Sequence, residues 1–185
     1  MSGICGYVGP GDPSVLELML NAIAYRGDKT HTAIVPGVGL GYRWWGGRPG
    51  KSPGVHHAGS HLVACAGTLA PPSPDPAASL LERLQASPPR LDDLDGAFVC
   101  ACWDGKTLTP LRDPFGVRSL YHVQHQGVFY FASELKQLLA IPGLPVELDL
   151  LAVHKYLTFS FVPGEDVPIK GVRRLLPGRV ATWSS

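Results

Sequence analysis

The chain has 185 residues, of which 45% are hydrophobic and 17% are charged, and its formal net charge is +1. A chain of this length and apolar content can bury one sizeable core, so we expect one soluble domain spanning residues 1–185. No long run of Lys or Arg suggests nucleic acid as a partner, and no apolar stretch reaches the roughly 20 residues that span a bilayer. The start of the chain also lacks a secretory pattern, which predicts a cytoplasmic protein.

The first helix is expected just after the opening apolar run ICGYVG. Asp12 is suited to cap it and Pro13 to be its first residue, and the helix should end near Arg26-Gly27. Its buried face is predicted from apolar residues at helical spacing, which are Leu16, Met19, Leu20 and Ile23.

The segment from residue 41 to 60, GYRWWGGRPGKSPGVHHAGS, is the longest one without clear periodicity, and long loops often carry function. It contains GGRPGKS, which approaches a phosphate-binding loop. The Walker pattern needs glycine five positions before Gly50, and Trp45 stands there, so the match fails. His56 and His57 have no carboxylate at a telling spacing, and we interpret them as a solvated pair in a loop.

A second helix follows the proline-rich stretch 69–78, which we interpret as a loop and not as a domain boundary. Asp75 and Pro76 repeat the capping pattern of the first helix, and Leu80, Leu81 and Leu84 supply its apolar face.

The remaining segments are short apolar runs typical of strands. Asp104-Gly105 predicts a hairpin between AFVCACW and KTLTPL. AFVCACW is apolar at nearly every position, so both of its faces should be covered by further layers. Four cysteines lie in strand-like runs without zinc-site spacing, and we interpret them as small buried hydrophobes, with Cys5 also open to a chemical role: Cys5, Cys65, Cys100 and Cys102.

Several segments together resemble the class II glutamine amidotransferase domain, an N-terminal-nucleophile glutaminase, in its asparagine synthetase version. They are SGICGYVG, AYRGD, DLDGAFVCACWDG with LRDPFGVRSLYH, and FASELKQLL. Residues 146–185 resemble the tail that leads toward the ATP-using synthetase domain of that family. The resemblance implies an α+β fold, a four-layer αββα sandwich.

The resemblance places the nucleophile at position 2. The family opens Met-Cys-Gly-Ile-x-Gly, and removal of Met frees a cysteine whose own α-amine serves as base. This chain reads Met-Ser-Gly-Ile-Cys-Gly, so Ser2 takes that position. A rival alignment uses Cys5 and requires removal of four residues. A replacement of an original cysteine would explain Ser2, but not the changes described next.

The largest departure from the family is at the oxyanion hole. The family has Asn-Gly-Glu where this chain has Ala66-Gly67-Thr68, so the Gly67 backbone NH is kept and the amide donor is absent. Loss of one such donor typically costs about 10²- to 10³-fold in rate. Asn21, on the first helix, is the only asparagine in the chain, so no neighbouring amide can replace it.

Two residues match the family's substrate-binding positions. Arg43 falls where an arginine binds the α-carboxylate of glutamine, with a surface arginine packed on Trp44 or Trp45 as the alternative. Asp75 matches the aspartate that receives the α-amine, a role compatible with capping the second helix. We interpret the two tryptophans as cover for a sheet edge.

Arg112, Asp113 and Arg118 are predicted to form a structural ion-pair turn without a catalytic role.

Together these features predict a degenerate glutaminase-like domain that serves as a structural or docking part of an ATP-dependent, asparagine synthetase-like enzyme. The partner would be a synthetase domain or a separate subunit, because the chain contains no Ser-Gly-Gly-x-Asp-Ser loop. ATP and Mg are expected only in that partner, with no cofactor or metal in this domain. The alternative is an active amidohydrolase that releases ammonia from glutamine through Ser2.

Overall fold

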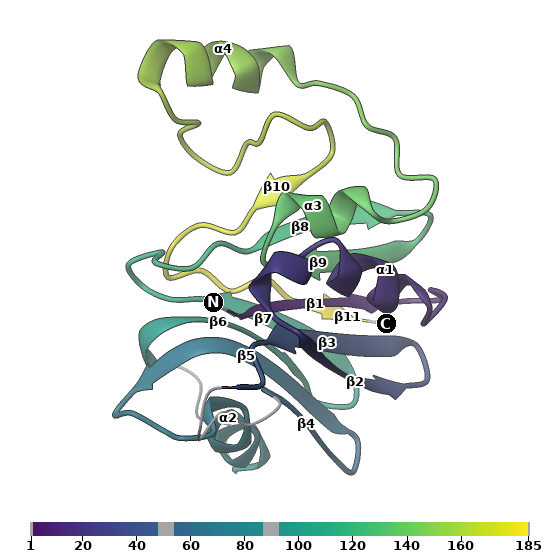
Figure 1. The fold of residues 1–185 in the computed structure, drawn as a ribbon, viewed down its shortest axis with the longest axis vertical. Helices are drawn as coiled ribbons and strands as arrows, with labels where there is room; N and C mark the ends of the chain where they lie inside the picture. Colours follow the sequence, from purple (N-terminus) through teal and green to yellow (C-terminus); the bar gives the residue numbers. More distant parts are fainter. Residues whose placement is uncertain (1, 48–53, 87–92, 185) are drawn as a thin grey trace.

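The computed structural model describes residues 2–47, 54–86 and 93–184, and these residues form two antiparallel sheets with helices on the outer faces (Figure 1). The phosphate-loop-like segment GGRPGKS therefore lies largely outside the described residues. The elements in chain order are β1 (Gly3–Val8), α1 (Val15–Asn21), the 3₁₀ helix η1 (Ala24–Arg26), β2 (Lys29–Val35), β3 (Val38–Trp44), β4 (Val55–Ala58), β5 (His61–Ala70), α2 (Pro76–Gln85), β6 (Asp95–Trp103), β7 (Thr107–Arg112), β8 (Tyr121–His125), β9 (Val128–Ala132), α3 (Leu135–Leu139), α4 (Leu150–Phe159), β10 (Arg173–Arg174) and β11 (Trp183–Ser184).

The two sheets pack face to face as the central layers of a sandwich. One has the strand order β10-β8-β9-β1-β3-β2 and the other β11-β7-β6-β5-β4. Helices α1 and α3 cover the outer face of the first sheet, and α2 covers that of the second. The predicted αββα layering is confirmed.

Three buried clusters follow from this layering. One lies between the sheets and includes Ile4, Leu40 and Ala66. The second lies under α1 and α3, and the third lies under α2. Strand β6 contributes Val99 to the first cluster and Cys100 to the third, which confirms that both of its faces are covered.

The first helix begins later than the sequence predicted. Asp12 does not cap it; its Oδ1 accepts a hydrogen bond from the Ser14 amide at 2.9 Å, so the chain makes a turn before the helix begins at Val15. The prediction for the second helix is confirmed, because Asp75 Oδ1 accepts from the Ala78 amide at 3.0 Å and Pro76 is the first helical residue.

The hairpin prediction is also confirmed, because β6 and β7 pair on either side of Asp104-Gly105. Asp104 Oδ1 accepts from the amides of Lys106 and Thr107, and Gly105 has a φ of +98°. The segment expected to be a long loop is partly strand, since β3 extends through Trp44 and β4 begins at Val55. The glycines in this segment interrupt the alternation of apolar and polar residues from which strands are predicted.

Helix α4 was not predicted from the sequence, and it stands apart from the sheets at one end of the molecule (Figure 1). The feature of the sequence that could have indicated this helix is its N-cap, Asp149, whose Oδ1 accepts hydrogen bonds from the amides of Leu151 and Ala152. Among the described residues, no helix has both the length and the apolar character of a membrane span.

Candidate active site

Ser2 lies in the wall of a cavity of about 400 Å³ at one end of the sandwich. The residue is 3% exposed and directly precedes β1, whose position is fixed by hydrogen bonds on both sides. The Ser2 carbonyl accepts a hydrogen bond from Arg26 Nη1 at 3.0 Å, and the Ile4 amide donates to Ser133 Oγ at 2.9 Å. The start of the chain is thus anchored beside the cavity.

An ion pair closes one side of this cavity. Arg26 pairs with Glu134, and the Tyr25 hydroxyl donates to the same carboxylate. Glu134 is also held by a capping box with Gln137 at the start of α3. The contacts join η1, which follows α1, to α3, and they hold Arg26 where it can reach the Ser2 carbonyl.

Tyr42 contacts Ser2 from strand β3. Burial raises the pKa of the Tyr42 phenol, and a hydrogen bond with the Ser2 side chain acts in the opposite direction. The Tyr42 ring stacks on Trp44 with 5.3 Å between centroids, and both side chains belong to or pack against the core between the sheets. Trp44 therefore covers the inter-sheet core, while Trp45 is 45% exposed.

The oxyanion segment lies on β5. Ala66 is 1% exposed and faces the core between the sheets, where its strand partner is Val99, a residue of the cavity wall. A methyl group and an isopropyl group therefore stand where the family resemblance places an amide donor. Neither can donate a hydrogen bond to an oxyanion.

Gly67 has a steric reason to be glycine. Its φ is +127°, and a Cβ built on it would lie 2.1 Å from the carbonyl oxygen of Ala97 and 2.7 Å from the Phe98 Cα. Backbone atoms cannot move away as a flexible side chain can. Glycine at position 67 is thus required by the β5–β6 pairing, whether or not its NH serves an oxyanion.

The structure does not bring Arg43 into the Ser2 cavity. Side chains alternate along β3, so Tyr42 faces the core between the sheets and Arg43 faces the α1 layer. Its Nε donates to the Gly27 carbonyl at 2.7 Å, and its Nη1 donates to the Leu20 carbonyl at 3.1 Å and to Asn21 Oδ1 at 3.3 Å. Arg43 thus fixes the end of α1, and it is not a surface residue stacked on tryptophan.

The Asp75 carboxylate already contacts His56. His56 Nε2 lies 2.8 Å from Asp75 Oδ2, while Asp75 Oδ1 caps α2. The interpretation of His56 as a loop residue without a carboxylate partner is wrong. β4 places it beside the start of α2, a long-range pairing that spacing in the sequence does not reveal.

Cys5 is a poor nucleophile in this fold. It is fully buried under α1 within β1, and burial raises the pKa of its thiol, against a smaller opposing hydrogen bond with Gln137. A thiol must ionise to attack, so the rival alignment places its nucleophile where ionisation is most costly. The other three cysteines are also buried.

The predicted turn at residues 112–118 is present, but the hydrogen bonds of its Arg112 and Asp113 side chains are to the backbone. Asp113 is fully buried and accepts from the amides of Val117 and Arg118 at 2.9 and 3.0 Å. Arg112 donates to the carbonyls of Gly116, Arg118 and Leu175. The turn also places Val117, Arg118 and Ser119 in the wall of the Ser2 cavity, which the sequence analysis missed.

Comparison with known proteins identifies the family of this chain. A family profile described as a glutamine amidotransferase domain matches residues 82–185, more than half of the chain. The chain belongs to this glutamine amidotransferase family. The matched residues do not include Ser2, Arg43, Gly67 or Asp75.

The similar curated proteins are asparagine synthetases. The glutamine-hydrolysing asparagine synthetase 1 of Bacillus subtilis is 34% identical over 87 residues, which is 46% of this chain and 14% of that protein. A putative glutamine-hydrolysing asparagine synthetase of Mycobacterium tuberculosis H37Rv is 38% identical over 93 residues, covering 48% of this chain and 14% of that protein. The matched region is thus about one seventh of the length of these relatives.

Solved structures show the same fold. The B. subtilis glutamine phosphoribosylpyrophosphate amidotransferase, complexed with ADP and GMP, aligns with a TM-score of 0.60 at 13% identity, covering 75% of this chain and 43% of that one. A structure described as the allosteric regulatory enzyme of purine biosynthesis aligns with a TM-score of 0.59 at 14% identity, with the same coverage of both chains. At such identities the likeness concerns the fold of this amidotransferase domain.

Within the described ranges, no group of three or more His, Cys, Asp or Glu side chains is arranged to hold a metal ion.

Proposed function

We propose that this amidotransferase domain has lost most of its glutaminase activity and serves as a structural, docking part of an ATP-dependent, asparagine synthetase-like enzyme in the cytoplasm. The observation that carries the proposal is Ala66. Its methyl group faces the core between the sheets beside Val99, which lines the Ser2 cavity, and a methyl group cannot donate a hydrogen bond to an oxyanion. A hydroxyl is a weaker nucleophile than a thiol and depends more on activation and oxyanion stabilisation by its surroundings. Ser2 lacks the amide donor that would stabilise the oxyanion in the family.

The two predicted substrate-binding residues support the same proposal. Arg43 donates to three acceptors near the end of α1, and Asp75 pairs with His56 while it caps α2. Each contact satisfies within the fold a group that a glutaminase would need for its ligand. Binding glutamine through them would require breaking these contacts first, at a cost in affinity.

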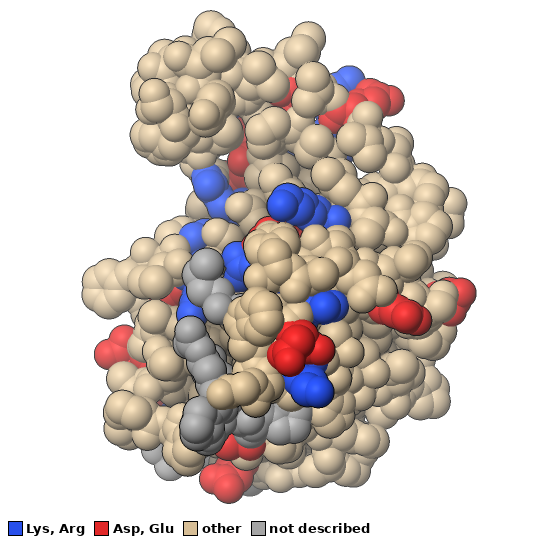
Figure 2. All heavy atoms as spheres, in the orientation of Figure 1, with Lys and Arg blue, Asp and Glu red and all other residues tan. Residues whose placement is uncertain are grey.

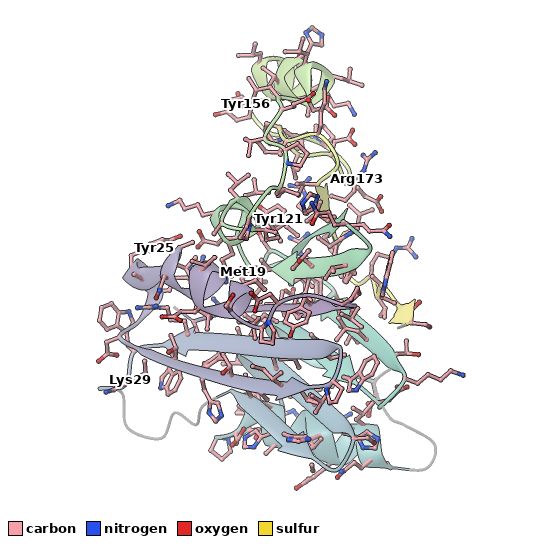
Figure 3. The ribbon with its side chains drawn as sticks, turned by 90° about the vertical axis from the view of Figure 1, so that its right-hand side faces the viewer. Met19, Tyr25, Lys29, Tyr121, Tyr156 and Arg173 are labelled. Atoms are coloured by element: carbon pink, nitrogen blue, oxygen red, sulfur yellow. The ribbon has the colours of Figure 1, made fainter. Side chains whose placement is uncertain are left out.

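The docking surface in this proposal is the outward side of α4. Large apolar side chains are exposed there, at 73% for Leu150 and 75% for Leu157, and Phe161, just after the helix, is 61% exposed. Ala152 is the one buried residue of the described helix. Figure 2 shows the upper left of this lobe without charged side chains, and Figure 3 shows Tyr156 on the helix far from the sheets. Apolar patches of this kind mark interaction sites.

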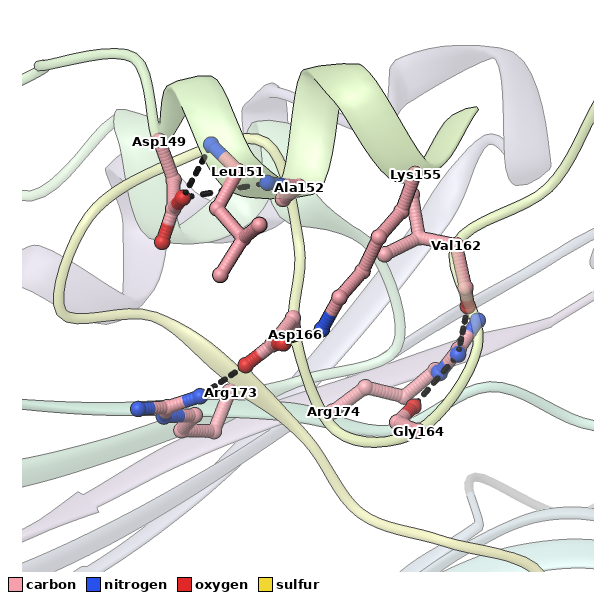
Figure 4. A network of polar contacts seen from close by, with 9 residues as sticks. All are labelled: Asp149, Leu151, Ala152, Lys155, Val162, Gly164, Asp166, Arg173 and Arg174. Atoms are coloured by element: carbon pink, nitrogen blue, oxygen red, sulfur yellow. Dashed lines mark hydrogen bonds and ion pairs between the residues drawn. The ribbon is translucent and has the colours of Figure 1, made fainter. Parts of the chain in front are cut away.

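Polar contacts hold α4 in place. Lys155 Nζ lies 2.5 Å from Asp166, which also pairs with Arg173 (Figure 4). Arg174 donates to the carbonyls of Val162 and Gly164, both at 2.6 Å, and so fixes the segment after the helix. The helix is thus presented in one orientation with its apolar side outward, which lowers the entropy cost of docking.

The occupant that we propose is an ATP-dependent synthetase domain, either covalently continuous or a separate subunit. The similar proteins are named asparagine synthetases, and the matched region is a small part of their length. ATP and Mg would bind in that partner. An enzyme of this kind that takes the attacking amine from its own substrate would need no ammonia from glutamine. It would therefore tolerate Ser2 and Ala66 in place of the family's cysteine and asparagine.

The docking proposal is tested by co-purification with an ATP–pyrophosphate exchange assay on the captured protein. The wild-type chain is expected to retain a synthetase that catalyses this exchange, and Leu157→Glu should abolish retention. Leu18→Glu is the matched control, because Leu18 is 44% exposed on α1, away from α4. If both variants retain the synthetase equally well, α4 is not part of the interface.

A second function is favoured by the cavity itself. Ser2 lines a space large enough for a small ligand, and its side chain opposes the rise that burial causes in the pKa of Tyr42. In an active amidohydrolase, Ser2 would attack the glutamine amide carbon while its freed α-amine accepts the hydroxyl proton, and the Gly67 NH would hold the oxyanion. Intact mass and ammonia release from glutamine decide between the two functions: loss of Met1 with turnover abolished by Ser2→Ala supports the active enzyme.

A further inference from the structure

The Ser2 cavity contains three cationic side chains, Arg26, Arg118 and Lys136, and a single carboxylate, Glu134. Figure 2 shows Lys and Arg side chains gathered on this face below the lobe that carries α4. Two of the three cavity cations are engaged with neighbours. Arg26 pairs with Glu134 and donates to the Ser2 carbonyl, and Lys136 Nζ lies 4.6 Å from the centre of the Tyr25 ring.

The third cation, Arg118, differs from these two. Among the residues that the structure describes, none forms a hydrogen bond or an ion pair with its guanidinium. Arg118 is half-buried, so water only partly solvates its charge. A partly buried guanidinium without an acceptor is a group to which an anion can bind with little competition from the protein.

The backbone of Arg118 is fixed in place. Its amide donates to Asp113 Oδ2 at 3.0 Å, and its carbonyl accepts from Arg112 Nε at 2.5 Å. Both of these partners are buried, Asp113 completely. The turn therefore presents the Arg118 side chain at the cavity wall without further ordering of the backbone, which favours ligand binding.

The charge of Arg118 acts at the Ser2 end of the cavity. Burial raises the pKa of Tyr42, the hydrogen bond with Ser2 opposes that shift, and the positive charge of Arg118 opposes it as well. Arg118 and Ser2 thus act on the same phenol. A ligand that spans the cavity would meet a cation and a hydroxyl within one small space.

We infer that Arg118 binds the carboxylate of a small amino acid in the Ser2 cavity, in place of Arg43. Arg43 faces the α1 layer and donates to three acceptors there, whereas Arg118 lines the cavity. The guanidinium fork matches a carboxylate with two parallel hydrogen bonds, and about 400 Å³ is within the usual range of small-ligand pockets. The inference rests on the proposed function for the type of ligand, but it requires no turnover.

The test is isothermal titration calorimetry with L-glutamate, which the protein cannot hydrolyse. Wild-type protein should bind L-glutamate, and Arg118→Gln should weaken binding by at least about tenfold. Arg118→Lys, which keeps the charge and loses the fork, should fall between the two. Arg179→Gln is the matched control, because Arg179 is exposed and outside the cavity, and it should bind as wild type does.

Three results would overturn the inference: no binding of L-glutamate by the wild type, equal affinity in wild type and Arg118→Gln, or equal weakening by Arg179→Gln. Inorganic phosphate is titrated in parallel, and displacement of L-glutamate by phosphate at equal concentration would show a general anion site in place of a carboxylate site. Ammonia release from glutamine, measured separately, would overturn the loss of glutaminase activity and leave this inference standing.

Discussion

Restoring the two altered chemical groups should restore glutaminase activity. The change is Ser2→Cys combined with Ala66→Asn, which supplies a thiol and an oxyanion donor. One such donor is worth about 10²- to 10³-fold in rate. We therefore expect the double variant to release ammonia from glutamine at least about 10²-fold faster than Ser2→Cys alone.

The same substitution has a cost that follows from the packing. Ala66 is 1% exposed in the core between the sheets, so asparagine must overfill the site and bury an amide. Overfilling costs about 1–3 kcal/mol and an incompletely paired amide about 1–3 kcal/mol, about 2–6 kcal/mol together. For a chain of this length the Tm should fall by roughly 4 to 24 °C. Ammonia release should therefore be measured at a temperature well below the lowered Tm.

Ala64→Asn is the matched control for this experiment. Ala64 lies one pleat away on the same face of β5, is fully buried in the same core, and should lose similar stability. It should gain no activity. If Ser2→Cys alone is as fast as the double variant, or if Ala64→Asn accelerates the reaction equally, the argument about the missing donor is wrong.

Three further predictions concern stability. Gly67→Ala should destabilise the fold by more than about 3 kcal/mol in urea unfolding, because its Cβ meets the Ala97 carbonyl, whereas Gly127→Ala, with φ +77° and open space, should lose only about 1–2 kcal/mol. Asp75→Asn should keep most of the α2 cap, while Asp75→Ala should lose about 1 kcal/mol. Hydrogen bonding by Lys155, followed by nearby positive charge, lowers the pKa of Asp166, so its stabilising effect should be complete above about pH 3.9 and disappear as pH falls through the lowered folded pKa.

Each of these has a result that would contradict it. Equal losses in the two glycine variants would show that backbone strain and not the clash sets the cost. Equal losses for Asn and Ala at position 75 would mean that the contact of the Asp75 carboxylate with His56 contributes more to stability than the cap does. Asp166→Asn should reduce the pH dependence of the free energy of unfolding below about pH 4. An unchanged pH dependence would show that Asp166 does not contribute to holding α4.

Local patterns in the sequence were enough for much of the fold. The Asp75-Pro76 cap, the Asp104-Gly105 turn and the continuous apolar run of β6 each depend on nearest neighbours, and all three are present in the structure. The family resemblance added the four-layer arrangement. The start of α1 was predicted too early because Asp12 can bond within a turn as readily as it can cap a helix.

Tertiary structure alone decided what surrounds the candidate site. Position 43 is an arginine in the sequence, but strand alternation and pairing with β1 turn it toward α1. The contact between His56 and Asp75 joins two elements that are distant along the chain, and the turn at Asp113 brings Arg118 to the Ser2 cavity. Spacing along the chain determines caps and turns, because these depend on neighbouring residues. Which side chain faces a ligand depends on which face of a sheet is covered, and only the packed layers determine that.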